Sequence, residues 1–157
     1  MKYEMVNLEE RLVEGIGVKT TNQNGQAVQD IGTLWQRFFG EGIYGKIEGK
    51  INDRTIGLYT AYEGDYTKPY TFMTGVEVSH FSKELAGRMT TVIPKGTYAK
   101  FVITGKNAQE AVGSLWGEIW KMNLPRNYIC DFEEYAGMDD DGKVNEIYIY
   151  IGLKSER

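Results

Sequence analysis

The sequence predicts an α+β fold in which two strand–helix–strand–strand units, related by pseudo-twofold symmetry, form one antiparallel sheet with two main helices. The first observation is that this order of elements occurs twice within 157 residues. The second is a match between the two helices, in which Ile31-Gly32-Thr33-Leu34-Trp35 corresponds to Val112-Gly113-Ser114-Leu115-Trp116. The third is that one unit alone buries its sheet and helix poorly, so two units are expected to pack together. We therefore expect a single domain, residues 1–157, with internal units at about 5–80 and 88–154 and a ligand crevice at their junction.

The first unit is predicted from apolar periodicity and from the turns between its elements. It is expected to contain the strand Arg11–Thr20, the helix Ala27–Phe39, the strand Thr55–Tyr62 and the strand Tyr70–Val78. The helix shows apolar residues at three- and four-residue spacing and ends at Gly40, a typical stop signal. Residues 45–53 are rich in glycine and charge and are predicted to be a connector, and residues 63–69 are predicted to be a turn.

The second unit repeats this order after a polar link at residues 80–87. Its expected elements are a short strand Met89–Ile93, the strand Thr97–Thr104, the helix Ala108–Met122, the strand Tyr128–Tyr135 and the strand Glu146–Ile151. Asn107, with Glu110 three residues later, predicts the start of the helix, and Pro125 lies just beyond its end. Residues 139–142, Asp-Asp-Asp-Gly, are predicted to form a hairpin turn, since a calcium loop would need further spaced ligands.

Composition excludes several classes of function. The formal charge is −4 and no lysine- or arginine-rich block occurs, so direct binding of nucleic acid is disfavoured. The single cysteine, Cys130, excludes an internal disulfide and fits a reducing compartment. Neither a signal peptide nor an apolar run of membrane-spanning length is evident, so a soluble, cytoplasmic protein is expected.

The usual catalytic and metal-binding motifs are missing from the sequence. It contains no Gly-x-Ser-x-Gly motif, no phosphate-binding loop and no dinucleotide fingerprint. His80 is the only histidine and lies in a polar link, and Cys130 is interpreted as a buried structural thiol. We therefore expect neither a metal site nor a cofactor.

Carboxylates and tyrosines on the last two strands form the candidate site. Alternation places Glu133 and Tyr135 on one face of their strand, and it places Glu146, Tyr148 and Tyr150 on one face of the next. If the strands pair so that these faces coincide, a carboxylate in an aromatic cavity could bind a desolvated cation or act as a general acid or base. The alternative is a solvent-facing tyrosine ladder flanked by two surface glutamates.

Aromatic and apolar residues elsewhere are candidates for the walls of the same cavity. Trp35 and Trp116 occupy equivalent positions on the two helices, where core packing is the alternative to ligand contact. Phe39 and Met73 are placed with them as candidate ligand-binding residues.

The order and spacing of several motifs resemble those of the GyrI-like effector-binding domains, the ligand-sensing domains of many AraC- and MerR-type bacterial regulators. The resemblance covers about residues 5–154. It is carried by the segments Ile93-Pro94-Lys95-Gly96-Thr97-Tyr98, Leu115-Trp116, Leu124-Pro125, Phe132-Glu133-Glu134-Tyr135 and Glu146-Ile147-Tyr148-Ile149, and in the first unit by the Trp35 helix and the strand Phe72–Val78.

The resemblance implies a drug- or metabolite-binding cavity between two pseudosymmetric units. In this family the glutamate of the Phe-Glu-x-Tyr pattern, here Glu133, is the acid of the pocket, and positions like Glu146 and Tyr148 contribute to its wall. The last strand often carries a proline where this sequence has Tyr150, which changes the expected depth of the pocket.

The resulting functional hypothesis is non-enzymatic binding of amphipathic, cationic aromatic small molecules, for sensing or sequestration. With no helix-turn-helix segment in the sequence, the chain is expected to act like the stand-alone members of the family, alone or beside a separate regulator. One alternative is a hydrolase of reactive genotoxins that uses Glu133 and Tyr135. Another is a protein-interaction module such as a modulator of gyrase.

Overall fold

A computed structural model of the chain describes residues 2–155. This part contains eight strands, three α-helices and one turn of 3-10 helix. The strands are β1 (Glu4–Leu8), β2 (Arg11–Thr20), β3 (Lys50–Thr60), β4 (Tyr70–Val78), β5 (Met89–Ile93), β6 (Gly96–Thr104), β7 (Arg126–Met138) and β8 (Val144–Leu153). The helices are α1 (Gln26–Gly40), α2 (Ile43–Lys46) and α3 (Ala108–Lys121), and a short 3-10 turn, Gln23–Gly25, precedes α1.

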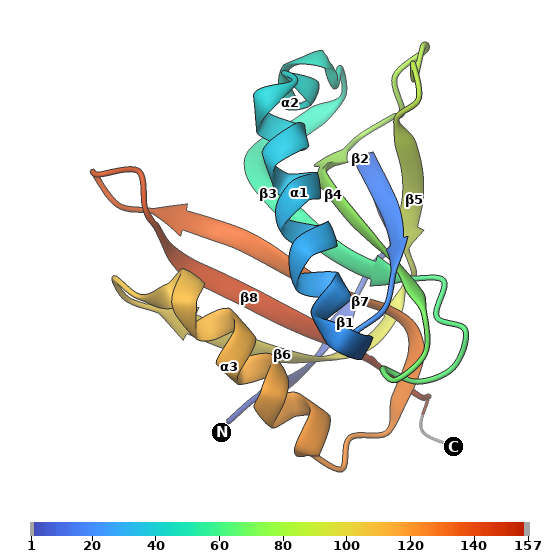
Figure 1. Cartoon of the computed structure of the whole chain (residues 1–157), viewed down its shortest axis with the longest axis vertical. Helices are drawn as coiled ribbons and strands as arrows, with labels where there is room; N and C mark the ends of the chain where they lie inside the picture. The colour runs from blue at the N-terminus through green and yellow to red at the C-terminus, as the bar shows by residue number, and fades with distance from the viewer. Residues whose placement is uncertain (1, 156–157) are drawn as a thin grey trace.

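All eight strands form one antiparallel sheet in the order β1-β6-β8-β7-β3-β4-β2-β5. The strands of the first unit, β3-β4-β2, mirror those of the second, β7-β8-β6, about the central pair β3 and β7. Both long helices lie on the same face of the sheet, α1 over the first unit and α3 over the second (Figure 1). The two-unit α+β architecture expected from the sequence is therefore confirmed.

Each unit also receives an outer strand from the chain segment that precedes the other unit. β1 leads into β2 but pairs with β6, with Leu8 opposite Gly96. Likewise, β5 leads into β6 but pairs with β2, with Ile93 opposite Arg11. This exchange ties the two units together at both edges of the sheet.

Three apolar clusters make the core. One lies between α1 and the first unit, and a second lies between α3 and the second unit, where Ile147, Ile149 and Ile151 are fully buried. The third lies on the opposite face of the sheet and includes Leu58, Met73 and Phe132. Since the face with the helices is covered by two separate helices, the junction between them is where a cavity can form.

Most predicted elements agree with the structure, and the differences have local causes. The strands at 11–20, 70–78 and 89–93 are confirmed to the residue. The predicted connector at 45–53 is wrong, because it contains part of α2 and the start of β3, which pairs with the end of β4 across a register shift. β1 was not predicted, since its five residues are mostly exposed and carry little alternation.

In the part of the chain that the structure describes, no helix combines the length and apolar character needed to cross a membrane.

Candidate functional site

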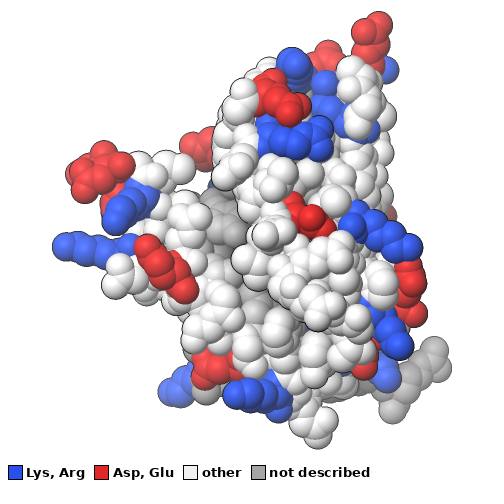
Figure 2. Space-filling model, viewed as in Figure 1, with Lys and Arg blue, Asp and Glu red and all other residues white. Residues whose placement is uncertain are grey.

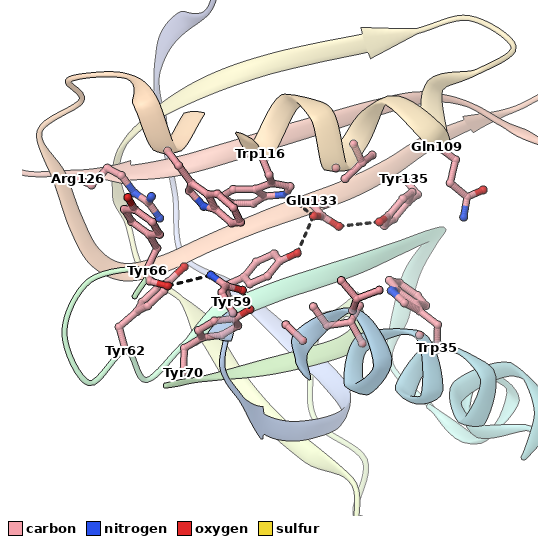
Figure 3. Close-up of a pocket in the computed structure, with 18 residues that line it drawn as sticks. Trp35, Tyr59, Tyr62, Tyr66, Tyr70, Gln109, Trp116, Arg126, Glu133 and Tyr135 are labelled. Atoms are coloured by element: carbon pink, nitrogen blue, oxygen red, sulfur yellow. Dashed lines mark hydrogen bonds between the residues drawn. The ribbon is translucent and has the colours of Figure 1, made fainter. Parts of the chain in front are cut away.

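A cavity of about 630 Å³ lies between α1 and α3 above the β3–β7 junction. Its volume is within the range usual for small-molecule sites. Most of its lining is apolar or aromatic, as Figure 3 shows. On the face of the molecule shown in Figure 2, the acidic and basic side chains lie mainly around the periphery, and other residues cover most of the centre.

The duplicated sequence motif lines both sides of this cavity. Ile31, Gly32 and Trp35 contribute from α1, and their counterparts Val112, Gly113 and Trp116 contribute from α3. A Cβ atom added at Gly32 or Gly113 would meet no atom within 4 Å, so these glycines leave open space where the two helices face each other. The two copies of the repeated motif therefore form opposing walls of the pocket.

Glu133 lies at the floor of the cavity and is only 3% exposed. Three hydrogen bonds end on its carboxylate: the Tyr135 hydroxyl donates to Oε1 (2.6 Å), and the Trp116 indole N–H (2.6 Å) and the Tyr59 hydroxyl (2.8 Å) donate to Oε2. The donors come from β7, α3 and β3, so both units contribute to holding one acid (Figure 3).

The buried carboxylate has no basic partner. Among residues 2–155, no lysine, arginine or histidine lies within 4.0 Å of Glu133. Burial raises the pKa of Glu133 above its ordinary value, although the hydrogen bonds from Tyr135, Trp116 and Tyr59 act in the opposite direction. A charged carboxylate in this position is therefore costly and is stabilised only by neutral donors.

The neighbouring tyrosines are held in their neutral form. Burial, followed by the charge of Glu133, raises the pKa of Tyr59 and of Tyr135 well above the ordinary value. Burial also raises the pKa of Tyr70 to about 12. These hydroxyls therefore act as hydrogen-bond donors at neutral pH rather than as bases.

Gly57 provides the space that the carboxylate occupies. It is the direct cross-strand neighbour of Glu133 on β3. A Cβ atom at this position would lie 3.1 Å from Glu133 Oε1 and 3.1 Å from the ring of Phe72. The absence of a side chain here lets the acid lie flat across the junction.

Aromatic rings pack edge-on and face-on around the acid. Trp35 meets Tyr135 edge to face with a centroid distance of 5.4 Å, and Tyr59 contacts Trp116 at 5.0 Å. Tyr66, from the turn between β3 and β4, stacks on Trp120 of α3 at 5.3 Å with an interplanar angle of 7°. This last pair joins the two units beside the cavity, and both rings line it.

A second charged group lies at one end of the pocket. Asp131 is fully buried and accepts hydrogen bonds from Arg126 Nη2 (2.7 Å), the Tyr62 hydroxyl (2.6 Å) and the backbone N–H of Gly152 (2.8 Å). Arg126 lines the cavity, and the Asp131 charge raises its pKa against the opposing effect of burial. The Arg126–Asp131 pair is neutral overall, so Glu133 determines the net negative charge of the pocket.

The structure separates the predicted site residues into two groups. It brings Glu133, Tyr135, Trp35 and Trp116 together around the cavity. The prediction that Glu146, Tyr148 and Tyr150 share this face is wrong.

The reason is the register between β7 and β8. Glu133 stands opposite Ile149, and Glu134 stands opposite Tyr148. The isoleucine face of β8 therefore lies toward the helices with Glu133. Its polar and aromatic face lies with Glu134 and Phe132 on the other side of the sheet, where Tyr150 stacks on Phe132 at 4.5 Å. Alternation identified both faces of each strand correctly but could not state which face of one strand matches which face of the other.

Two further candidates also lie outside the cavity lining. Met73 is fully buried in the apolar cluster on the opposite face of the sheet, beside Leu58 and Phe132. Phe39 is 58% exposed and stacks on the ring of Trp35 at 6.0 Å, so it supports the wall from behind.

Several lining residues were not predicted from the sequence, namely Tyr59, Tyr62, Tyr66, Tyr70 and Arg126. A usable signal existed for Tyr59, because the duplication pairs the strand at 55–62 with the strand at 128–135 as symmetry equivalents. The other four come from the turn 63–69 and its flanks, or from the first residue of β7. Whether the side chains of these four residues point into the cavity depends on how the segments that carry them pack over the sheet.

No group of three or more His, Cys, Asp or Glu side chains within residues 2–155 is arranged to hold a metal ion. The polar groups that line the cavity are one carboxylate, several phenols and indoles, the side-chain amides of Asn22 and Gln109, and a guanidinium.

The paired units, the two facing helices and the buried acid between them define a GyrI-like effector-binding domain. Within that class, residues 4–153 match the family model for Cass2, the integron-associated effector binding protein, and the chain belongs to this family.

Solved structures show the same fold. The integron cassette protein VCH_CASS2 of Vibrio cholerae is 26% identical, with a TM-score of 0.74 over 97% of this chain and 95% of that chain. SAV2435, solved with tetraphenylphosphonium bound, is 20% identical, with a TM-score of 0.75 over 98% and 94%. The C-terminal domain of EcmrR is 14% identical, with a TM-score of 0.58 over 99% and 100%. A search of curated protein sequences gives no significant match.

Proposed function

We propose that this protein binds amphipathic aromatic cations in the cavity between α1 and α3, with Glu133 as the charge complement. One observation carries the proposal: Glu133 is 3% exposed in an aromatic cavity and has no basic partner among residues 2–155. A cation that enters the cavity supplies the missing charge, and the faces of the surrounding rings attract it as well.

Membership of an effector-binding family supports a small-molecule ligand. SAV2435, a protein of the same fold, was solved with tetraphenylphosphonium, which is an aromatic cation. The volume of about 630 Å³ is sufficient for a ligand of that class. A role in sensing, directly or through a separate regulator, fits the family.

The geometry favours binding over hydrolysis. A carboxylate offers about four lone-pair positions, and the three protein donors leave only one of them, on Oε1 of Glu133, free. A general base needs a free position directed at the attacking water. Here the neutral donors fix the carboxylate in place, which suits a static charge complement.

Isothermal titration calorimetry with tetraphenylphosphonium tests the proposal. We expect saturable binding with one site, and we expect Glu133→Gln to weaken it more than tenfold, a loss of about 1.4 kcal/mol or more. Glu134→Gln is the matched control, since Glu134 is the next residue on β7, is 4% exposed and lies on the opposite face.

Equal affinities of the wild type and Glu133→Gln would refute the role of the charge. Equal losses in both variants would also refute it, because the effect would then be general to the strand. Product analysis after the same incubation addresses catalysis, and a turnover that disappears in Glu133→Gln would favour the hydrolase instead.

A further inference from the structure

Arg126 lies at the opposite end of the cavity from Tyr135 and is the only basic side chain in the lining among residues 2–155 (Figure 3). Its side chain is only 4% exposed. Its Nη2 donates to Asp131, whereas Nε and Nη1 are buried and have no acceptor within the part of the chain that the structure describes.

Unpartnered donors of this kind are expensive. A buried donor without an acceptor costs about 1–3 kcal/mol, and more when it is charged. The ring of Tyr128 lies 4.3 Å from the guanidinium carbon and offers only its π face. Asp131 is already satisfied by Arg126, Tyr62 and Gly152, so it does not compensate Nε or Nη1.

The cavity contains two polar sites, the Glu133 carboxylate and the Arg126 guanidinium. Asp131 and Glu133 are two residues apart on β7 and point to the same face, which separates them by about 7 Å along the strand. Arg126, which donates to Asp131, lines the end of the pocket opposite Tyr135 (Figure 3). A ligand held at Glu133 therefore has a second set of polar contacts within the length of a short chain.

The charge at the Arg126 site indicates which ligand group can bind there. Arg126 and Asp131 form a neutral pair, and Glu133 repels an anion. A neutral oxygen acceptor, such as a carbonyl, gains the free N–H groups without that repulsion. Since Nε and Nη1 are buried, a ligand acceptor reaches them only after a neighbouring side chain shifts, and the half-buried Tyr128 ring, 4.3 Å from the guanidinium carbon, is a neighbour that could do so.

From these contacts we infer that the preferred ligands are aromatic cations that carry a neutral carbonyl-type acceptor on a short chain, with Glu133 facing the cation and Arg126 donating to the acceptor. This inference rests on the proposed function and specifies its ligand class. It assigns Arg126 as a specificity-determining residue of the pocket.

Two matched probes test it by calorimetry: (5-oxohexyl)triphenylphosphonium, which carries the carbonyl, and hexyltriphenylphosphonium, which does not. We expect the wild type to bind the ketone about tenfold more tightly than the alkyl probe. In Arg126→Lys, which keeps a cation for Asp131 but lacks Nε and Nη1, we expect the ratio of the two affinities to fall to about one.

If Arg126→Lys does not fold, Arg126→Met combined with Asp131→Asn removes both charges together and should give the same ratio. A ratio near one in the wild type overturns the inference, as does a tenfold ratio that survives in the variants. In both cases the alkyl probe still binds, so the proposed function stands. If neither probe binds the wild type, the proposed function fails and this inference fails with it.

Discussion

Replacement of Glu133 by Gln should stabilise the unliganded protein at neutral pH while it weakens cation binding. The side chain keeps its shape, and its hydrogen bonds can be retained: the amide oxygen accepts from Trp116 and Tyr59, and the amide nitrogen donates to the Tyr135 hydroxyl. What is removed is a buried charge without a basic partner. Because burial of that charge destabilises the folded state, its removal should raise the free energy of unfolding.

The magnitude follows from the linkage between the pKa of Glu133 and folding. Burial raises the folded-state pKa above the ordinary value of 4.5, so between these two pKa values the folded protein binds more protons than the unfolded chain. Stability from this group is therefore highest below the ordinary pKa, falls as the pH rises through the window, and is constant above it. Each unit of elevation corresponds to about 1.4 kcal/mol, and 1 kcal/mol shifts the Tm of a chain of this size by roughly 2–4 °C.

Thermal unfolding from pH 4 to pH 8 measures this effect. We expect Glu133→Gln to have the higher Tm at neutral pH, and we expect the difference to shrink toward pH 4, where the wild-type carboxyl group is mostly protonated in both states. Glu134→Gln should instead lower the Tm, because Glu134 lies 3.7 Å from Arg11 and 3.6 Å from Arg54 and loses both ion pairs. A lower Tm for Glu133→Gln at neutral pH, or a difference that does not change with pH, would refute the reasoning.

The affinity for tetraphenylphosphonium should increase from acidic to neutral pH as Glu133 ionises, because a bound cation favours the charged carboxylate. Calorimetry across this pH range should give an affinity that does not change with pH for Glu133→Gln. A wild-type affinity that does not change with pH would contradict the role of Glu133. Gly113→Leu should fill the space between the helices, weaken binding more than tenfold and raise the Tm, since a helical glycine costs about 0.8–1.0 kcal/mol relative to a good helix former. Unchanged affinity in Gly113→Leu would mean that the ligand does not lie between α1 and α3.

The function of the pocket and its stability cost have the same origin. A cavity that is aromatic, partly closed and acidic destabilises its own carboxylate, and only neutral donors from both units keep it in place. Under the proposed function, a bound cation would relieve this cost, and part of the affinity would then come from the destabilised carboxylate of the empty state. The exchange of β1 and β5 between the units joins them at both edges of the sheet that carries this site.

The sequence by itself determined the elements of this protein and their repetition. Apolar periodicity predicted α1 and α3 to within one residue at each end, because amphipathic helices are specified locally. The repeated Ile-Gly-Thr-Leu-Trp and Val-Gly-Ser-Leu-Trp motifs predicted two related units. The resemblance to GyrI-like domains then distinguished Glu133 from Glu134, in agreement with the parity of their strand.

Only the tertiary structure decided which faces meet. A strand pattern states that alternate residues differ, but the register between β7 and β8 places Ile149, not Tyr148, beside Glu133. Packing also decided two of the three donors to the acid, Tyr59 from the other unit and Trp116 from α3, whereas Tyr135 lies on the same strand as Glu133. The sequence did not predict Arg126 as a lining residue, because the end of the pocket where it lies is built from segments far apart in the chain. Such contacts depend on the mutual packing of whole elements, which no local pattern encodes.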